Sequence, residues 1–246
     1  MESNKKYCKN CNHEVHGNYC IHCGQQTKVH RIDFHLISHG LLHGIAHFDK
    51  GFLYTAKELN SRPGHTIREY FEGKRVSHAN PLFMLLILGG ILSYVYYHFA
   101  IKTLTSFNIA EIDQYSETLH FISSKYFSLT YIAFCFVFAL LDSLFFNYKN
   151  YNYVEYFFLN IFIAIEIIFL NLMASPLFYY LKGTGFNIYL RLIIIGLFSV
   201  YFFIVRYQFF NLQHDKKGFK RLILEMFFYL AIVLVFGHTT VQSIFK

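Results

Sequence analysis

Four cysteines near the start of the chain have the spacing of a metal site. Cys8, Cys11, Cys20 and Cys23 form a C-x2-C-x8-C-x2-C array within the first 25 residues. Two Cys-x-x-Cys turns can present four thiolates in a tetrahedron about 2.3 Å from a Zn²⁺ ion, and four protein ligands leave no position for water. Closed sites of this kind are structural. The array therefore predicts one structural zinc ion.

The surroundings of the cysteines favour zinc over disulfide or redox chemistry. Gly24 follows the second pair and tolerates the left-handed backbone that turns amide N–H groups toward the sulfurs. Met1 to Lys6 contain no apolar run of a secretory signal, so we expect a reducing cytoplasm, which disfavours stable disulfides. A thioredoxin-type site would need a strand followed by a helix, for which this segment is too short. We interpret His13, His16 and His22 as solvated loop residues.

A second group of candidate ligands follows in the connector. The histidine stripe consists of His35, His39, His43 and His47, spaced by four residues. On a helix they share one face, and apolar residues such as Phe34 and Leu41 lie opposite. We favour an amphipathic helix that lies against the membrane or the protein. The alternative is a second metal site or a pH sensor, because histidines four residues apart can chelate one metal.

Four basic residues come shortly before the hydrophobic half of the chain. We expect one short helix over residues 52–59 and another over residues 66–73, separated by Pro63, which opens a helix more readily than it continues one. The basic collar consists of Arg62, Arg68, Lys74 and Arg75. Each of these charges can contribute about 1 kcal/mol of attraction to anionic lipid. The alternative is a surface for a phosphorylated ligand or a protein partner, since Arg suits phosphate and carboxylate.

The composition predicts an integral membrane protein. Of the 246 residues, 54% are hydrophobic and only 15% are charged, which leaves too little polar surface for a soluble globule. Most of the His and Cys residues precede Pro81, and the Phe and Tyr residues concentrate after it. The net charge is +7, and the positions of the Lys and Arg residues are those expected of the loops of a membrane protein. We therefore expect membrane lipid, and not nucleic acid, as the partner.

Five apolar segments are long enough to be transmembrane helices. With a window of about 20 residues, they fall at residues 81–101, 126–147, 154–181, 188–210 and 221–243. Pro176 should kink the third segment or end it early. We therefore predict an all-α integral membrane protein of about five spans in residues 81–246. It is preceded by a zinc ribbon (residues 1–25) and cytoplasmic amphipathic and basic helices (residues 26–80).

The distribution of Lys and Arg predicts the orientation. Of these 22 residues, 17 fall before the first span or in the second and fourth connections, and the other five fall on the opposite side. The positive-inside rule then places the N-terminus in the cytoplasm and the C-terminus outside. We expect a multi-pass protein of the bacterial cytoplasmic (inner) membrane.

Charged residues inside the predicted spans are costly and need partners. Glu166 lies near the middle of the third span, Asp142 in the last turns of the second, and Arg206 near the cytoplasmic end of the fourth. Asp142 and Arg206 have similar depth and could pair. We interpret such residues as links between helices, with an ion or proton site as the alternative.

Several segments together carry a family resemblance. They are Tyr19-Cys20-x-x-Cys23-Gly24-Gln25, Arg62-Pro63-Gly64, Ile67-Arg68-Glu69-Tyr70, Gly73-Lys74-Arg75 and Asn80-Pro81. The chain resembles, mostly over residues 8–85, the DUF3667 family of bacterial membrane proteins, found mainly in Bacteroidota. The resemblance implies zinc binding and a membrane-embedded C-terminal half, but no established activity.

These observations favour a nonenzymatic protein. The sequence has no H-E-x-x-H, G-x-S-x-G or glycine-rich phosphate loop, and no nucleophile paired with a base in a motif. We predict a docking or assembly component with a protein partner at the cytoplasmic face. The alternative is a transporter or channel subunit that uses Glu166 and Asp142, although five spans do not divide into two repeats.

Overall fold

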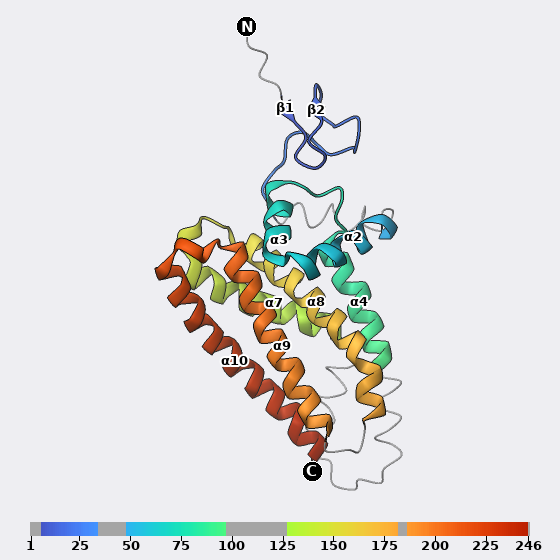
Figure 1. Cartoon of the computed structure of the whole chain (residues 1–246), viewed down its shortest axis with the longest axis vertical. Coiled ribbons are helices and arrows are strands. Elements are labelled where there is room, and N and C mark those ends of the chain that lie inside the picture. Colours follow the sequence, from blue (N-terminus) through green and yellow to red (C-terminus); the bar gives the residue numbers. More distant parts are fainter. Residues whose placement is uncertain (1–5, 34–47, 97–126, 182–185, 246) are drawn as a thin grey trace.

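The computed structural model describes residues 6–33, 48–96, 127–181 and 186–245, and this part of the chain is mostly helical. A bundle of long helices carries a layer of two shorter helices at one end, and a small ribbon lies beyond that layer (Figure 1). The histidine stripe (His35, His39, His43 and His47) lies outside the described residues. Both interpretations of it therefore remain predictions.

The long helices coincide with the five apolar segments of the sequence. They are α4 (Pro81–Tyr96), α7 (Phe127–Phe146), α8 (Tyr153–Tyr180), α9 (Phe186–Phe209) and α10 (Lys216–Phe245). Three stretches are long and apolar enough to cross a membrane, namely Ser128–Lys149, Tyr153–Leu177 and Leu192–Phe209. Helix α4 is apolar but shorter over Pro81–Val95. The count of five spans remains a prediction.

The outer faces of the bundle are apolar. Leu144 on α7, Leu197 on α9 and Phe227 on α10 are 73%, 56% and 68% exposed. Large apolar side chains in such numbers are poorly solvated by water and well solvated by lipid chains. The surface therefore supports the membrane location that the helix lengths allow.

Helix α8 lies at the centre of the bundle. Of its spanning stretch, 61% is buried, against 22% for each of the other two stretches. It packs against α4, α7 and α9, and residues such as Phe162 and Ile165 are fully buried. A helix that is apolar on all sides is expected to be surrounded by other helices.

Helix α8 continues through Pro176 to Tyr180, so of the two expected effects of this proline the early end is wrong and the kink stays a prediction. Pro176 has no N–H for the carbonyl of Leu172, one turn earlier. The Ser175 hydroxyl donates to that carbonyl over 2.8 Å. The serine beside the proline thus satisfies the carbonyl, and the helix can continue in an apolar environment.

The layer on the bundle consists of α2 (Phe48–Ser61) and α3 (Pro63–Glu72). Both helices were expected, but α3 begins at Pro63 and not at Thr66, because proline is favoured in the first turn, where its missing N–H costs nothing. Helix α3 ends at Gly73, whose φ of +118° allows its N–H to bind the carbonyls of Glu69 and Tyr70. Asn80 caps α4 by accepting hydrogen bonds from the N–H groups of Leu82 and Phe83.

Helix α3 approaches α9 closely at Gly64. A Cβ atom on Gly64 would lie 2.5 Å from the Gln208 Cβ and from the Val205 carbonyl oxygen, and 2.6 Å from the Phe209 nitrogen. The Gly64 N–H donates to the Gln208 side-chain oxygen over 3.0 Å. Because two of the three clashing atoms are backbone, only glycine fits without moving a helix.

Gly64→Ala should therefore destabilise the protein by about 1–3 kcal/mol, although alanine is the better helix former. Gly90→Ala in α4 is the matched control, because a Cβ there meets nothing within 4 Å. The measurement is thermal unfolding of both variants in detergent. Equal midpoints for Gly64→Ala and the parent would show that the two helices can separate at this contact.

Candidate metal centre

The ribbon consists of two equivalent Cys-x-x-Cys turns. Strands β1 (Lys6–Tyr7) and β2 (Glu14–Val15) pair around the first turn, and a bridge between Tyr19 and Gln26 encloses the second. The N–H of Cys8 donates to the His13 carbonyl and that of Cys20 to the Gln25 carbonyl, over 2.8 and 2.9 Å. Each turn is thus fixed by the same backbone pattern.

A left-handed residue follows each cysteine pair. Gly24 has φ +74°, as its position predicted, and Asn12 has φ +59° at the equivalent place in the first turn. Their N–H groups donate to the carbonyls of Cys20 and Cys8, over 2.8 and 2.9 Å. Glycine and asparagine are the residues that adopt this backbone most readily, so both turns close without strain.

The four sulfur atoms converge on one point. The Sγ atoms of Cys8 and Cys23 lie 3.5 Å apart, as do those of Cys11 and Cys20, and all four lie within 4.8 Å of one another. A tetrahedral site with metal–sulfur distances of about 2.3 Å requires sulfur atoms about 3.8 Å apart. None of the four forms a disulfide. The cluster can therefore hold a metal ion, as the spacing predicted.

The four thiol groups of the cluster can all ionise only if a cation binds between them. Burial opposes ionisation of Cys20, but the backbone N–H groups of Cys23 and His22 outweigh it and lower the pKa of this thiol to about 6. The backbone of His13 favours the thiolate of Cys11, but burial and the other sulfurs outweigh it and raise its pKa to about 12. Four adjacent thiolates repel one another, so a divalent cation is what allows all four to ionise.

The nearby histidines lie outside the sulfur cluster. The rings of His13 and His22 stack on each other with centroids 3.9 Å apart, and His16 lies 4.0 Å from Glu14. Among the described residues, the group that can hold a metal contains cysteines only.

The ribbon is joined to the α3–α4 connection by hydrogen bonds. The side-chain oxygen of Gln25 accepts from the N–H groups of Arg75 and Val76, over 3.3 and 3.2 Å. The side-chain oxygen of Asn10 accepts from the N–H and hydroxyl of Ser77, over 3.2 and 2.9 Å. Asn10 and Gln25 lie within or directly after the two cysteine turns. Closure of the two cysteine turns therefore also positions the groups that bind this connection.

Two residues of the basic collar belong to an ion-pair group on the layer. Arg62 contacts Glu58 and Glu69 over 2.6 and 2.5 Å, and Lys74 contacts Glu69 over 3.0 Å. Burial opposes ionisation of Glu69, but Arg62 and Lys74 outweigh it and lower its pKa. These cations stabilise the α2–α3 corner.

The other two collar residues bind backbone carbonyls. Arg68 donates to the carbonyls of Gln208 and Phe209, which end α9, and its Nη2 lies 2.7 Å from the second. Arg75 donates to the carbonyls of Tyr70 and His30 over 3.2 and 2.9 Å. All four collar cations thus have partners within the chain. A role toward lipid, phosphate or a protein partner remains a prediction that these contacts do not favour.

A buried polar cluster lies at the end of the bundle nearest the layer. Arg206 of α9 donates from Nε and Nη2 to the two oxygens of Asp142 on α7, each over 3.0 Å, which confirms the expected pair. Arg206 also binds Asn160 of α8 over 2.9 Å and Glu225 of α10 over 3.1 Å. All four residues are buried. The cluster thus links four helices through one guanidinium.

Glu166 lies apart from this cluster. It is 1% exposed, and one of its oxygens accepts from the side chain of Asn60 on α2 over 3.2 Å. Its other oxygen has no hydrogen-bond partner among the described residues. This carboxylate therefore attaches the layer to the central helix.

Two residues of these networks were missed in the sequence. Glu225 is an acidic residue within the predicted span 221–243. Because a charged residue inside a span needs a partner, its position in the sequence could have identified it as a member of the cluster. Glu155 binds Arg31 over 2.6 Å and joins the segment after the ribbon to the start of α8. No local pattern indicates that contact, because the two residues are far apart in the chain.

Comparison with known proteins confirms the resemblance over the layer and the first long helix, and the match does not extend to the ribbon. Residues 49–92 match the family described as DUF3667, a protein of unknown function. The match covers nearly all of α2, the whole of α3 and most of α4. No curated protein and no solved structure matches the chain.

The metal site predicts that the full-length protein purified without chelator contains close to one metal ion per chain. Cys20→Ser should lose most of it and make the ribbon sensitive to proteolysis, because the apolar cluster that stabilises the ribbon consists of the four cysteines and Val15. Cys135→Ser is the control, since Cys135 is buried in α7 away from the ribbon. Elemental analysis of the parent and of both variants measures the metal content, and limited proteolysis measures the change in the ribbon. A metal-free parent would refute the site.

The buried polar cluster predicts that Arg206→Met is strongly destabilising, by about 3–5 kcal/mol, because two carboxylates would then share a site without a cation. Adding Asp142→Asn and Glu225→Gln should restore part of the thermal stability in detergent, since the unpaired charges are removed. Lys217→Met, at an exposed position on α10, should change little. If Arg206→Met left the thermal stability unchanged, the cluster would not be what holds the helices together.

Proposed function

We propose that this is a nonenzymatic membrane protein in which a zinc ribbon serves as a docking module for a cytoplasmic protein partner. Zinc is the metal that a closed tetrahedral set of four cysteines favours, because thiolates are soft ligands and Zn²⁺ accepts this geometry readily. The convergence of the four sulfurs supports a structural ion.

The exposed apolar side chains of the ribbon carry the docking proposal. Ile21 lies between Cys20 and Cys23 and is 89% exposed, while Tyr7 and Tyr19 are 57% and 62% exposed. Tyr7 and Tyr19 each precede the first cysteine of a turn, so the two turns present a tyrosine at equivalent positions. Exposed aromatic and aliphatic side chains on a small rigid module are typical of a protein-binding surface.

The arrangement of the basic residues supports a cytoplasmic location for this surface. The layer, the α7–α8 connection and the α9–α10 connection lie at the same end of the bundle (Figure 1). The two connections contact each other, since Asp215 accepts from Tyr148 over 2.8 Å and pairs with Lys149 over 3.0 Å. Because most Lys and Arg gather at this end, we place it in the cytoplasm of a bacterial cell, with the bundle in the inner membrane.

Transport is the alternative and would use Glu166 and Asp142. Both oxygens of Asp142 bind Arg206, and one also binds Asn160, so this carboxylate has little capacity left for a transported ion. We therefore favour a structural role for Asp142. Since transport would need this residue to bind an ion, we favour docking over transport.

The test is site-specific photocrosslinking of the full-length protein in cells. A photoreactive residue at Ile21 or Tyr19 should give one discrete adduct, because both side chains would contact the partner. Ile21→Ser should reduce partner recovery by about tenfold, which is the loss expected for a central apolar contact. The matched control is a photoreactive residue at Leu53, which is 72% exposed but lies on α2.

The adduct should also disappear in Cys20→Ser, since the turn that presents Ile21 depends on the metal. Equal crosslinking from Leu53, or an adduct that persists in Cys20→Ser, would contradict docking through the ribbon.

A further inference from the structure

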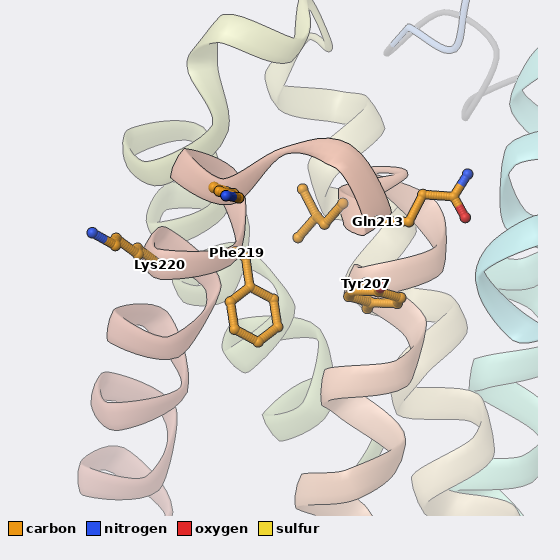
Figure 2. A pocket seen from close by; sticks show the side chains of 6 residues that line it. Tyr207, Gln213, Phe219 and Lys220 are labelled. Carbon is orange, nitrogen blue, oxygen red and sulfur yellow. The ribbon is translucent and has the colours of Figure 1, made fainter.

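A hollow of about 290 Å³ lies between the end of α9 and the start of α10. Its walls are formed by Tyr207, Leu212, Gln213, Lys216, Phe219 and Lys220. Figure 2 shows Tyr207 and Phe219 on opposite sides of the gap, with Lys220 extending outward from α10. The two aromatic rings are edge to face with centroids 6.3 Å apart. The hollow thus has an aromatic floor and a basic rim.

The charge of the rim is not neutralised within the described part of the chain. Lys216 and Lys220 are one helical turn apart and exposed, and no ion pair of theirs occurs among the described residues. Asp215 is the neighbouring acid, but it already binds Lys149, Tyr148 and the N–H of Gly218. The two ammonium groups are therefore available to an anion from outside.

The apolar surface continues from the hollow along both helices. On α10, Ile223 and Phe227 follow Lys216 and Lys220 on the same face and are 53% and 68% exposed. On α9, Ile204 and Val200 are 38% and 57% exposed. Along this face, basic side chains come first, aromatic rings second and long apolar side chains last. The same order of polarity runs from the headgroups of a bilayer to its acyl chains.

We propose that this hollow binds an anionic phospholipid of the cytoplasmic leaflet, with its phosphate between Lys216 and Lys220 and an acyl chain along Phe219 and Ile223. A soluble phosphate compound fits less well, because it would leave the apolar floor in water. A zwitterionic lipid fits less well, because its headgroup has no net charge for the two lysines. The proposal does not depend on the docking function of the ribbon.

The experiment uses the absence of tryptophan from the chain. Phe219→Trp places the only tryptophan in the hollow of the full-length protein, reconstituted in vesicles of phosphatidylcholine and phosphatidylglycerol. One of the two lipids is brominated, so that it quenches on contact. Brominated phosphatidylglycerol should quench the tryptophan fluorescence as strongly as if this lipid were enriched about fivefold or more beside the hollow, relative to its fraction in the vesicle. The reason is that each lysine attracts its phosphate. Leu197→Trp, on the lipid-exposed face of α9, should report the bulk composition.

Lysine variants distinguish a defined site from a diffuse surface charge. In the Phe219→Trp protein, Lys216→Gln and Lys220→Gln should each remove most of the enrichment. Lys217→Gln removes the same charge from a residue that does not line the hollow, so it should leave the enrichment unchanged. Equal losses in all three variants, or equal enrichment at Leu197→Trp, would refute the site.

Two further outcomes would also overturn the proposal. Inorganic phosphate that relieves the quenching would identify the ligand as a soluble anion and not a lipid. Native mass spectrometry of the protein without the tryptophan change should find phosphatidylglycerol retained in detergent, and retained less by Lys216→Gln than by Lys217→Gln. Equal retention of phosphatidylcholine would show that headgroup charge is not recognised.

Discussion

A polar group inside an apolar bundle has no water to bind, so it must find its partner within the protein. Many of the contacts between helices follow from this constraint. Arg206 is buried and binds two carboxylates and an amide from three other helices. The carbonyl that Pro176 leaves without a donor is bound by the adjacent Ser175. The carbonyls at the end of α9 are bound by Arg68 from outside the bundle. The contacts that pack these helices therefore also provide the hydrogen-bond partners of their buried polar groups.

The α3–α4 connection is where the metal ribbon and the bundle meet. On one side, Arg68 and Gly64 hold α3 against α9. On the other side, Gln25 and Asn10 bind the backbone of residues 75–77. The second pair of contacts requires two closed cysteine turns, and the first requires only the helices. Closure of the cysteine turns thus determines how the ribbon is oriented on a layer that the bundle already holds in place.

The sequence predicted the features that depend on local chemistry. The cysteine spacing, the left-handed Gly24 and the approximate positions of the long helices follow from residue type and short-range pattern, whereas the start of α3 was placed three residues too late. The Asp142–Arg206 pair could also be predicted, because depth in the membrane restricts the choice of partners. The roles of Arg62 and Arg68 could not, since a count of charges does not show whether a guanidinium faces lipid or its own chain. For Arg68 the distinction depends on a contact with Phe209, 141 positions away, whereas Arg62 pairs with Glu58 and Glu69, which are close in the sequence and which a count of charges overlooks.

The basic residues at the end of the bundle that carries the layer therefore divide by geometry and not by their order in the sequence. In the segment that matches the DUF3667 family, cations contact carboxylates and carbonyls of the chain and stabilise the layer. On α10, Lys216 and Lys220 extend from an exposed face with an apolar floor beside them. An ammonium group on a flexible stem suits a mobile lipid phosphate, whereas the planar fork of arginine suits fixed carbonyls and carboxylates. Arg62, Arg68 and Arg75 make such fixed contacts in the layer and its connection, where Lys74 adds one ion pair, whereas Lys216 and Lys220 on α10 have no ion pair among the described residues.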